Sequence, residues 1–228
     1  MAATKKPTTV ETYRNIMSEL KAGRFAPVYL LMGNESYYID KICDWFTSNL
    51  LTEEEKDFNQ TVLYGADTST QQIMEAARRY PVMAAKRLVI VRDLQAIKSL
   101  DMLEKYMENP VASTVLVLCY MNGVIDARKK IVTQINHSGR VLVSESPRYD
   151  KDIIAFINEY IRQPHYNASI EPRAAQVMAA HIGGDLKRVA SELDKLLVAF
   201  DDDKGRVITS DLIEQKIGIS KQYNVFEL

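Results

Sequence analysis

The sequence predicts an α/β domain, with a mainly parallel sheet flanked by helices, followed by a small all-α domain. Two observations support this fold class. Up to about Pro147, short apolar runs alternate with segments of helical periodicity, which is the pattern of a parallel sheet covered by helices. After Pro147, the apolar residues recur only at helical spacing. We therefore place the two domains at residues 1–147 and 148–228.

The elements of the first domain follow from its apolar runs and from the residues that end them. Apolar runs predict buried strands at residues 27–32, 58–64, 88–91, 114–119 and 141–143. Between them, helical spacing predicts helices around residues 10–20, 39–50, 73–80, 100–107 and 128–135. Gly23 and Pro81 end the first and third of these helices. Ser36 is the expected N-cap of the second helix.

The second domain shows helical spacing throughout. Apolar faces predict three helices, around residues 153–161, 172–182 and 186–200. Asp185 is the expected N-cap of the third, and Thr209 is expected to cap a last short helix. The chain stops at residues 224–228 on an apolar, helix-forming run without a cap, which predicts a chain cut from a longer protein.

The composition argues against several function classes. The chain has 228 residues and a formal net charge of −1, so no global field attracts nucleic acid and any DNA contact has to be local. No segment approaches membrane-spanning length and the polar start is not a signal peptide, so we expect a cytoplasmic protein without membrane contact. Cys43 and Cys119 are expected to be buried, reduced thiols, because no metal-ligand spacing surrounds them.

Catalytic and metal-binding motifs are absent from the sequence. There is no Gly-x-Ser-x-Gly elbow and no His-Glu-x-x-His helix. His137 and His165 fall in expected loops, and His181 falls on the apolar face of an expected helix. None of the three has a second ligand at metal spacing. We therefore expect packed or solvated histidines, no metal and no catalytic residue.

The turn before the third strand is unusual because it carries no charge. Residues 81–85 read Pro-Val-Met-Ala-Ala, where a connection between a helix and a strand is normally polar. An apolar turn at the surface either lies under a neighbour or binds a partner. From the residues alone, Val82 and Met83 either pack inward as part of the core or stay exposed for a partner. Tyr80 and Arg79 beside them are of the residue types enriched at binding hot spots.

A small basic cluster, Arg128, Lys129 and Lys130, stands at the expected start of a helix after the fourth strand. Such a cluster is either a solvated helix start or a local contact for a DNA phosphate or a partner.

The order of an α/β domain and then a helical lid resembles the plan of the AAA+ ATPases. A catalytic member carries Gly-x-x-x-x-Gly-Lys-Ser/Thr after the first strand, where backbone N–H groups cradle phosphate. Here Gly33 is followed by Asn34 and Glu35 without a Lys-Ser/Thr pair, and a carboxylate there repels a triphosphate. Of the residues that end strands, only Asp93 is even a weak candidate for holding a metal. We expect an AAA+-like domain that lacks a phosphate loop, binds no cofactor and hydrolyses no ATP.

Five motifs in order along the chain resemble the delta subunit of the bacterial DNA polymerase III clamp loader. The turn is one of them, with its Pro, two apolar residues, basic pair and apolar strand ending in Arg-Asp. The others are the segment of residues 27–37, the Asp-x-Arg-Lys-Lys of residues 126–130, the lid-helix segment of residues 192–196 and residues 224–228, which match the start of the family's collar region.

The resemblance implies a non-catalytic subunit that binds the sliding clamp of the DNA polymerase and helps to open it during DNA replication. The clamp-binding pair of the family maps onto Val82 and Met83, with Tyr80, Pro81 and Arg79 as neighbours. The family usually has larger residues there, so Val82 is a departure. Other loader subunits would bind through the collar domain, which this chain lacks, and DNA would be contacted indirectly within the loader. Within the holoenzyme, the subunit would be grouped with DNA-directed DNA polymerases, which are nucleotidyltransferases.

Two other functions are weighed against this one. A nucleotide-hydrolysing AAA+ enzyme is opposed by the missing phosphate loop, and ATP turnover by the purified chain would support it. A direct DNA-binding protein is opposed by the net charge, and salt-sensitive binding to duplex DNA would support it.

Overall fold

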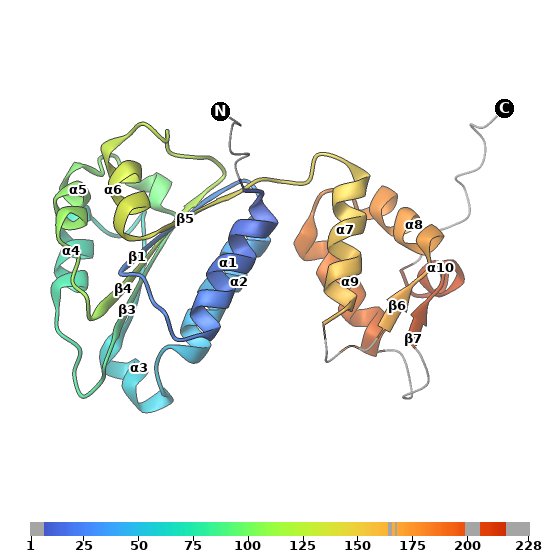
Figure 1. The fold of residues 1–228 in the computed structure, drawn as a ribbon, viewed down its shortest axis with the longest axis horizontal. Coiled ribbons are helices and arrows are strands. Elements are labelled where there is room, and N and C mark those ends of the chain that lie inside the picture. Colours follow the sequence, from blue (N-terminus) through green and yellow to red (C-terminus); the bar gives the residue numbers. More distant parts are fainter. Residues whose placement is uncertain (1–6, 164–165, 167, 199–205, 218–228) are drawn as a thin grey trace, which may run out of the picture. The chain divides into compact units, whose positions relative to one another are not determined.

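The computed structural model of this chain describes residues 7–163, 166, 168–198 and 206–217. The chain forms two compact units, Met1–Glu145 and Ser146–Leu228 (Figure 1). Among the described residues, no helix has both the length and the apolar character needed to cross a membrane.

The first unit is built on a five-stranded parallel sheet in the order β2-β3-β4-β1-β5. The strands are β1 (Val28–Gly33), β2 (Gln60–Tyr64), β3 (Arg87–Arg92), β4 (Thr114–Met121) and β5 (Arg140–Ser144). β4 lies in the centre, and β1, β3 and β4 are almost fully buried because helices cover both faces of the sheet. The prediction of a mainly parallel sheet flanked by helices is therefore confirmed.

The helices of the first unit form two layers, one on each face of the sheet (Figure 1). One face carries α1 (Thr9–Lys21) and α2 (Ser36–Asn49), and the other carries α4 (Thr70–Arg78), α5 (Asp101–Glu108) and α6 (Lys130–Ser138). Alternate residues of β1 serve the two layers. Tyr29 contacts Phe46 of α2 with ring centroids 4.9 Å apart, while its neighbours Val28 and Leu30 belong to the core cluster under α4, α5 and α6.

Two local features of the first unit differ from the sequence-based expectation. The strand expected from Phe58 begins at Gln60, because residues before it form a helix, α3 (Glu53–Asn59). Thr52 and Glu55 close a capping box at its start, which stabilises this short helix. The expected N-cap Ser36 is also wrong: Glu35 caps α2, accepting a hydrogen bond from the Tyr37 N–H at 2.7 Å. A short 3-10 helix, η1 (Leu94–Ala96), follows β3.

The two cysteines, which are far apart in the sequence, meet in the core of the first unit. Cys43 of α2 and Cys119 of β4 are both fully buried free thiols, with their Sγ atoms 3.4 Å apart. The hydrogen bond with Cys43, together with burial, raises the pKa of the Cys119 thiol. The structure thus agrees with the expectation of buried, reduced thiols.

The second unit is mainly helical, with α7 (Asp150–Ile161), α8 (Pro172–Ile182), α9 (Leu186–Val198) and α10 (Ser210–Ile217). Its described residues also include a feature that the sequence analysis missed, a two-stranded parallel sheet of β6 (Ala168–Ile170) and β7 (Arg206–Ile208). Each strand has three residues, too few to show a period of two in the sequence.

The helix starts of the second unit follow the expected capping chemistry. Asp185 accepts a hydrogen bond from the Arg188 N–H at 3.0 Å, and Thr209 accepts one from the Leu212 N–H at 3.2 Å. His181 was expected on the apolar face of α8 but is exposed, because the buried face is formed by its neighbours Ala174, Ala175, Met178, Ala179 and Ile182. The expected elements at residues 199–200 and 224–228, and His165, lie outside the described residues.

Candidate functional site

The apolar turn lies between α4 and β3, at the amino end of the β3 strand. α4 ends at Arg78, Arg79 is its extended C-cap, and β3 begins at Arg87. The side chains of the turn are exposed: 80% for Tyr80, 51% for Val82 and 98% for Met83. The alternative that Val82 and Met83 pack inward as part of the core is therefore wrong.

The backbone of the turn is held from one side by Asn59, the last residue of α3. The Asn59 side chain is fully buried, and its Oδ1 accepts a hydrogen bond from the Val82 N–H at 2.7 Å. Its Nδ2 donates to the Val82 carbonyl at 2.9 Å and to the Glu55 carbonyl at 3.0 Å. Both backbone polar groups of Val82 are thus bound by one amide side chain.

Arg87, at the other end of the turn, joins the C-terminal ends of α3 and α4. Its buried guanidinium donates from Nε to the Ala76 carbonyl at 3.1 Å and from Nη1 to the Phe58 carbonyl, also at 3.1 Å. Nη2 donates to the Thr61 hydroxyl at 3.2 Å. Because the two carbonyls lie at the C-terminal ends of α4 and α3, where helix dipoles are negative, a cation is favoured there. Burial, with a smaller effect from the nearby charge of Arg79, lowers the pKa of Arg87.

Three residues of this site were missed by sequence reasoning. Phe58 is 65% exposed at the end of α3, next in sequence to the residue that binds Val82. Asn59 and Arg87 were missed because their contacts join residues 23 and 29 positions apart in the chain. The capping box before Phe58 was the one signal that could have assigned it to a helix.

The basic cluster is not part of this site. Arg128, Lys129 and Lys130 follow the carboxyl end of β4, whereas the turn precedes the amino end of β3, and the two strands are parallel neighbours. The cluster and the turn therefore lie at opposite ends of these strands. Arg128 pairs with Asp126 at 2.6 Å and Lys130 with Glu108 at 3.0 Å, so two of the three cations already have carboxylate partners.

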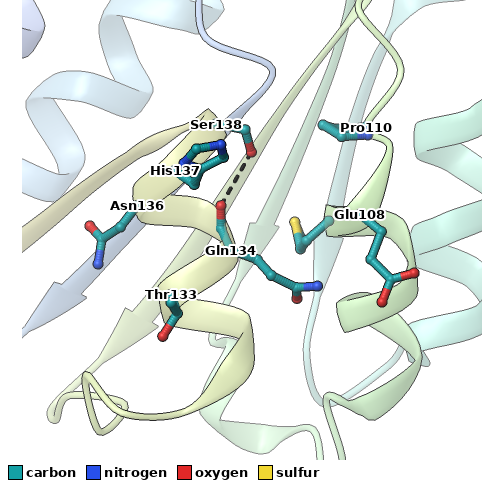
Figure 2. Close-up of a pocket in the computed structure, with 8 residues that line it drawn as sticks. Glu108, Pro110, Thr133, Gln134, Asn136, His137 and Ser138 are labelled. Atoms are coloured by element: carbon teal, nitrogen blue, oxygen red, sulfur yellow. Dashed lines mark hydrogen bonds between the residues drawn. The ribbon is translucent and has the colours of Figure 1, made fainter.

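A pocket of about 630 Å³ lies between α5 and α6 (Figure 2). Glu108 and His137 are its titratable lining residues, and Glu108 is already paired with Lys130. The hydrogen bond drawn in Figure 2 joins the Ser138 hydroxyl to the Gln134 backbone carbonyl and is internal to α6. Among the described residues, no group of three or more His, Cys, Asp or Glu side chains could hold a metal ion. The titratable groups of the pocket lining are thus one paired carboxylate and one imidazole.

The residues after β1 do not fit a nucleoside triphosphate. Only Asn34 and Glu35 separate the end of β1 from the start of α2. The buried carboxylate of Glu35 caps the N-terminus of α2. In proteins with a phosphate loop, the phosphate of the nucleotide takes this position. The Glu35 N–H, which a phosphate loop would direct to its ligand, donates instead to the Ser144 carbonyl at 3.1 Å.

The comparison with known proteins decides the family. Residues 29–145 match the family described as DNA polymerase III, delta subunit. The chain belongs to this family. It is 25% identical over 224 residues to DNA polymerase III subunit delta of Bacillus subtilis (strain 168), covering 94% of this chain and 63% of that protein. The chain thus spans less than two thirds of the length of this relative.

Solved structures agree with this assignment at the level of the fold. The Bacillus subtilis DNA clamp loader delta protein aligns with a TM-score of 0.72 at 24% identity, over 89% of this chain and 61% of that one. A point mutant of Thermotoga maritima RuvB aligns with a TM-score of 0.56 at 14% identity, over 92% and 69% of the two chains. The chain therefore shares its fold with these two proteins.

Proposed function

We propose that this delta subunit binds the sliding clamp of the DNA polymerase through residues 79–83 and helps to open it during DNA replication. The observation that carries the proposal is the exposure of Val82 and Met83 on a turn where the Val82 backbone is held by the buried Asn59 side chain. Family membership supplies the partner, because a clamp loader acts on a clamp.

The energetics of the turn suit an apolar anchor. Fully burying a side chain such as Val or Met contributes about 1.5–3 kcal/mol, and Met83 starts almost fully exposed. A fixed backbone lowers the ordering cost of binding. Tyr80 and Arg79 add an aromatic ring and a guanidinium at the rim, and Pro81 restricts the backbone between them and the anchor pair.

Clamp opening follows from differential binding. A ligand shifts an equilibrium only as far as it binds one state better than the other. If Val82 and Met83 enter a groove that is wider in the open clamp, burial of their side chains stabilises the open form. No chemical step is required of this chain, and the capped N-terminus of α2 leaves no place for nucleotide phosphates.

The wider assembly is part of the same proposal. Other clamp-loader subunits would be further partners, and the work would take place in the cytoplasm. DNA would be contacted within the loader, where Lys129 is a candidate, because its neighbours Arg128 and Lys130 are paired with carboxylates. That pairing gives no support to direct DNA binding by the chain alone.

The double substitution Val82→Ala/Met83→Ala tests the proposed function. We expect the Kd for the sliding clamp of the same organism to rise by about 30- to 150-fold, since the truncations remove about 2–3 kcal/mol of apolar burial. Isothermal titration calorimetry measures the change, with circular dichroism as a check on the fold.

The matched control is Val124→Ala/Met102→Ala, which truncates the same two residue types at other exposed positions of the first unit. This variant should bind the clamp like the wild type. Equal binding by the control and the test variant would discard the turn as the site. Absence of binding by the wild-type chain would contradict the proposed clamp binding.

A further inference from the structure

We infer that Asn59 is a positioning residue, which fixes the turn in the conformation that presents Val82 and Met83 to the clamp; this inference rests on the proposed function. Asn59 does not reach the partner itself, because its side chain is fully buried. Its effect comes through the backbone of Val82, to which its amide both donates and accepts.

The Asn59 amide connects α3 and the turn through hydrogen bonds. One hydrogen bond, to the Glu55 carbonyl, anchors the amide to its own helix. The two others, at 2.7 and 2.9 Å, replace the pair that a neighbouring strand would make with Val82. The Asn59 side chain therefore satisfies the N–H and the carbonyl of Val82 in the way that a neighbouring strand would.

The residue after Val82 has a strained backbone conformation. Met83 has φ +52°, in the left-handed region, which is unfavourable for a residue with a long side chain. Burial does not compensate for this conformation, because the Met83 side chain is almost fully exposed. Such a conformation persists only where the surrounding structure imposes it, and strain of this kind clusters at ligand-binding sites. The hydrogen bonds of Asn59 to the preceding residue, Val82, are contacts that can impose it.

Loss of the Asn59 hydrogen bonds would therefore weaken binding, because fewer molecules would have the turn conformation that presents Val82 and Met83. In Asn59→Ala, the N–H and carbonyl of Val82 turn to water and the turn samples other conformations. The apparent Kd rises by the inverse of the binding-competent fraction, so a fall to about one molecule in ten weakens clamp binding about tenfold. The contact residues Val82 and Met83 themselves are unchanged in this variant.

The experiment compares Asn59→Ala with Thr114→Val, at a temperature where the wild type and both variants are folded. Thr114 is an equally buried residue whose hydroxyl donates to the Ala77 carbonyl of α4 at 2.9 Å, and this contact does not involve the turn. Both variants lose stability, but only Asn59→Ala should lose about tenfold in clamp affinity. A role in stability alone would leave the Kd of the folded molecules unchanged in both variants.

Hydrogen exchange of the Val82 amide gives a second readout that needs no clamp. This amide should be protected in the wild type and in Thr114→Val, and should exchange rapidly in Asn59→Ala. If Asn59→Ala does not fold, the isosteric Asn59→Asp replaces it. This variant keeps the acceptor for the Val82 N–H, but it loses both donated hydrogen bonds and turns a carboxylate oxygen toward the carbonyls of Glu55 and Val82, so a loss of affinity is expected here too.

The outcomes separate the two proposals. Rapid exchange and weaker binding in Asn59→Ala support the positioning role. Wild-type affinity in a folded Asn59 variant, or an unprotected Val82 amide in the wild type, overturns that role and leaves the proposed function standing. Absence of binding by the wild-type chain overturns the proposed function, and the positioning role with it.

Discussion

Gly33→Ala is expected to destabilise the first unit by about 3–5 kcal/mol, because both the space and the backbone at this position exclude a side chain. A Cβ on Gly33 would lie 2.0 Å from the Ser144 carbonyl oxygen and 2.8 Å from the Ser144 nitrogen. These are backbone atoms at the end of β5, which cannot move aside as a flexible side chain can. Gly33 also has φ +135°, which an alanine adopts only with strain.

Urea denaturation followed by circular dichroism measures this loss, with Gly123→Ala as the control. A Cβ on Gly123 would come no closer than 3.3 Å, to a ring carbon of the Tyr120 side chain, which can adjust. We expect a change within about 1 kcal/mol for the control. A Gly33→Ala protein as stable as the wild type would show that β1 and β5 are not packed as closely as described.

The close packing of Gly33 against Ser144 involves the segment after β1, where the sequence lacks a phosphate loop. The Glu35 N–H donates to the Ser144 carbonyl, and the Gly33 backbone lies close to Ser144, in the segment where a nucleotide-binding protein would carry its phosphate loop. From the sequence, Glu35 was expected to repel a phosphate. The structure adds that its carboxylate takes over the helix N-terminus and that its N–H is bound to β5, so two of the loop's donors are already used.

Features with long apolar runs were predictable, and features that depend on distant contacts were not. Strand β4 and helix α9 are buried along their length or along one face, so period and burial agree in the sequence. α3 was missed because its polar, seven-residue sequence has no apolar face, and the apolar residues from Phe58 onward favoured a strand. β6 and β7 pair across more than thirty residues, and nothing local indicates which partner they find.

The candidate site also has one part that the sequence predicts and one part that it does not. The uncharged turn and its residues Val82 and Met83 were visible in the sequence, but their exposure was undecided until the fold placed them at the amino edge of β3. Asn59, which binds the turn, and Arg87, which joins the ends of α3 and α4, belong to no distinctive pattern in the sequence. Their roles come from three-dimensional neighbours, which a periodic pattern does not report.

Arg87→Met is expected to cost about 3 kcal/mol of stability and to disturb the turn as well. Methionine matches much of the arginine stem but donates no hydrogen bond, so the carbonyls of Ala76 and Phe58 each lose a charged donor. A hydrogen bond to a charged group contributes about 1.5–3 kcal/mol, and part of the loss is offset because the guanidinium no longer has to be buried. Its lowered pKa still leaves Arg87 charged at neutral pH.

Two further substitutions identify the cause of the loss. Arg87→Lys keeps the charge but not the fork that reaches three acceptors, so an intermediate stability is expected in urea denaturation. Arg128→Met removes an exposed arginine whose described ion pair is with Asp126, and should leave stability unchanged. If Arg87→Lys equalled the wild type, charge alone would hold the ends of α3 and α4 together. If Arg87→Met equalled it, the contacts of this guanidinium would be dispensable, and the Asn59 amide would be left as the main support of the turn.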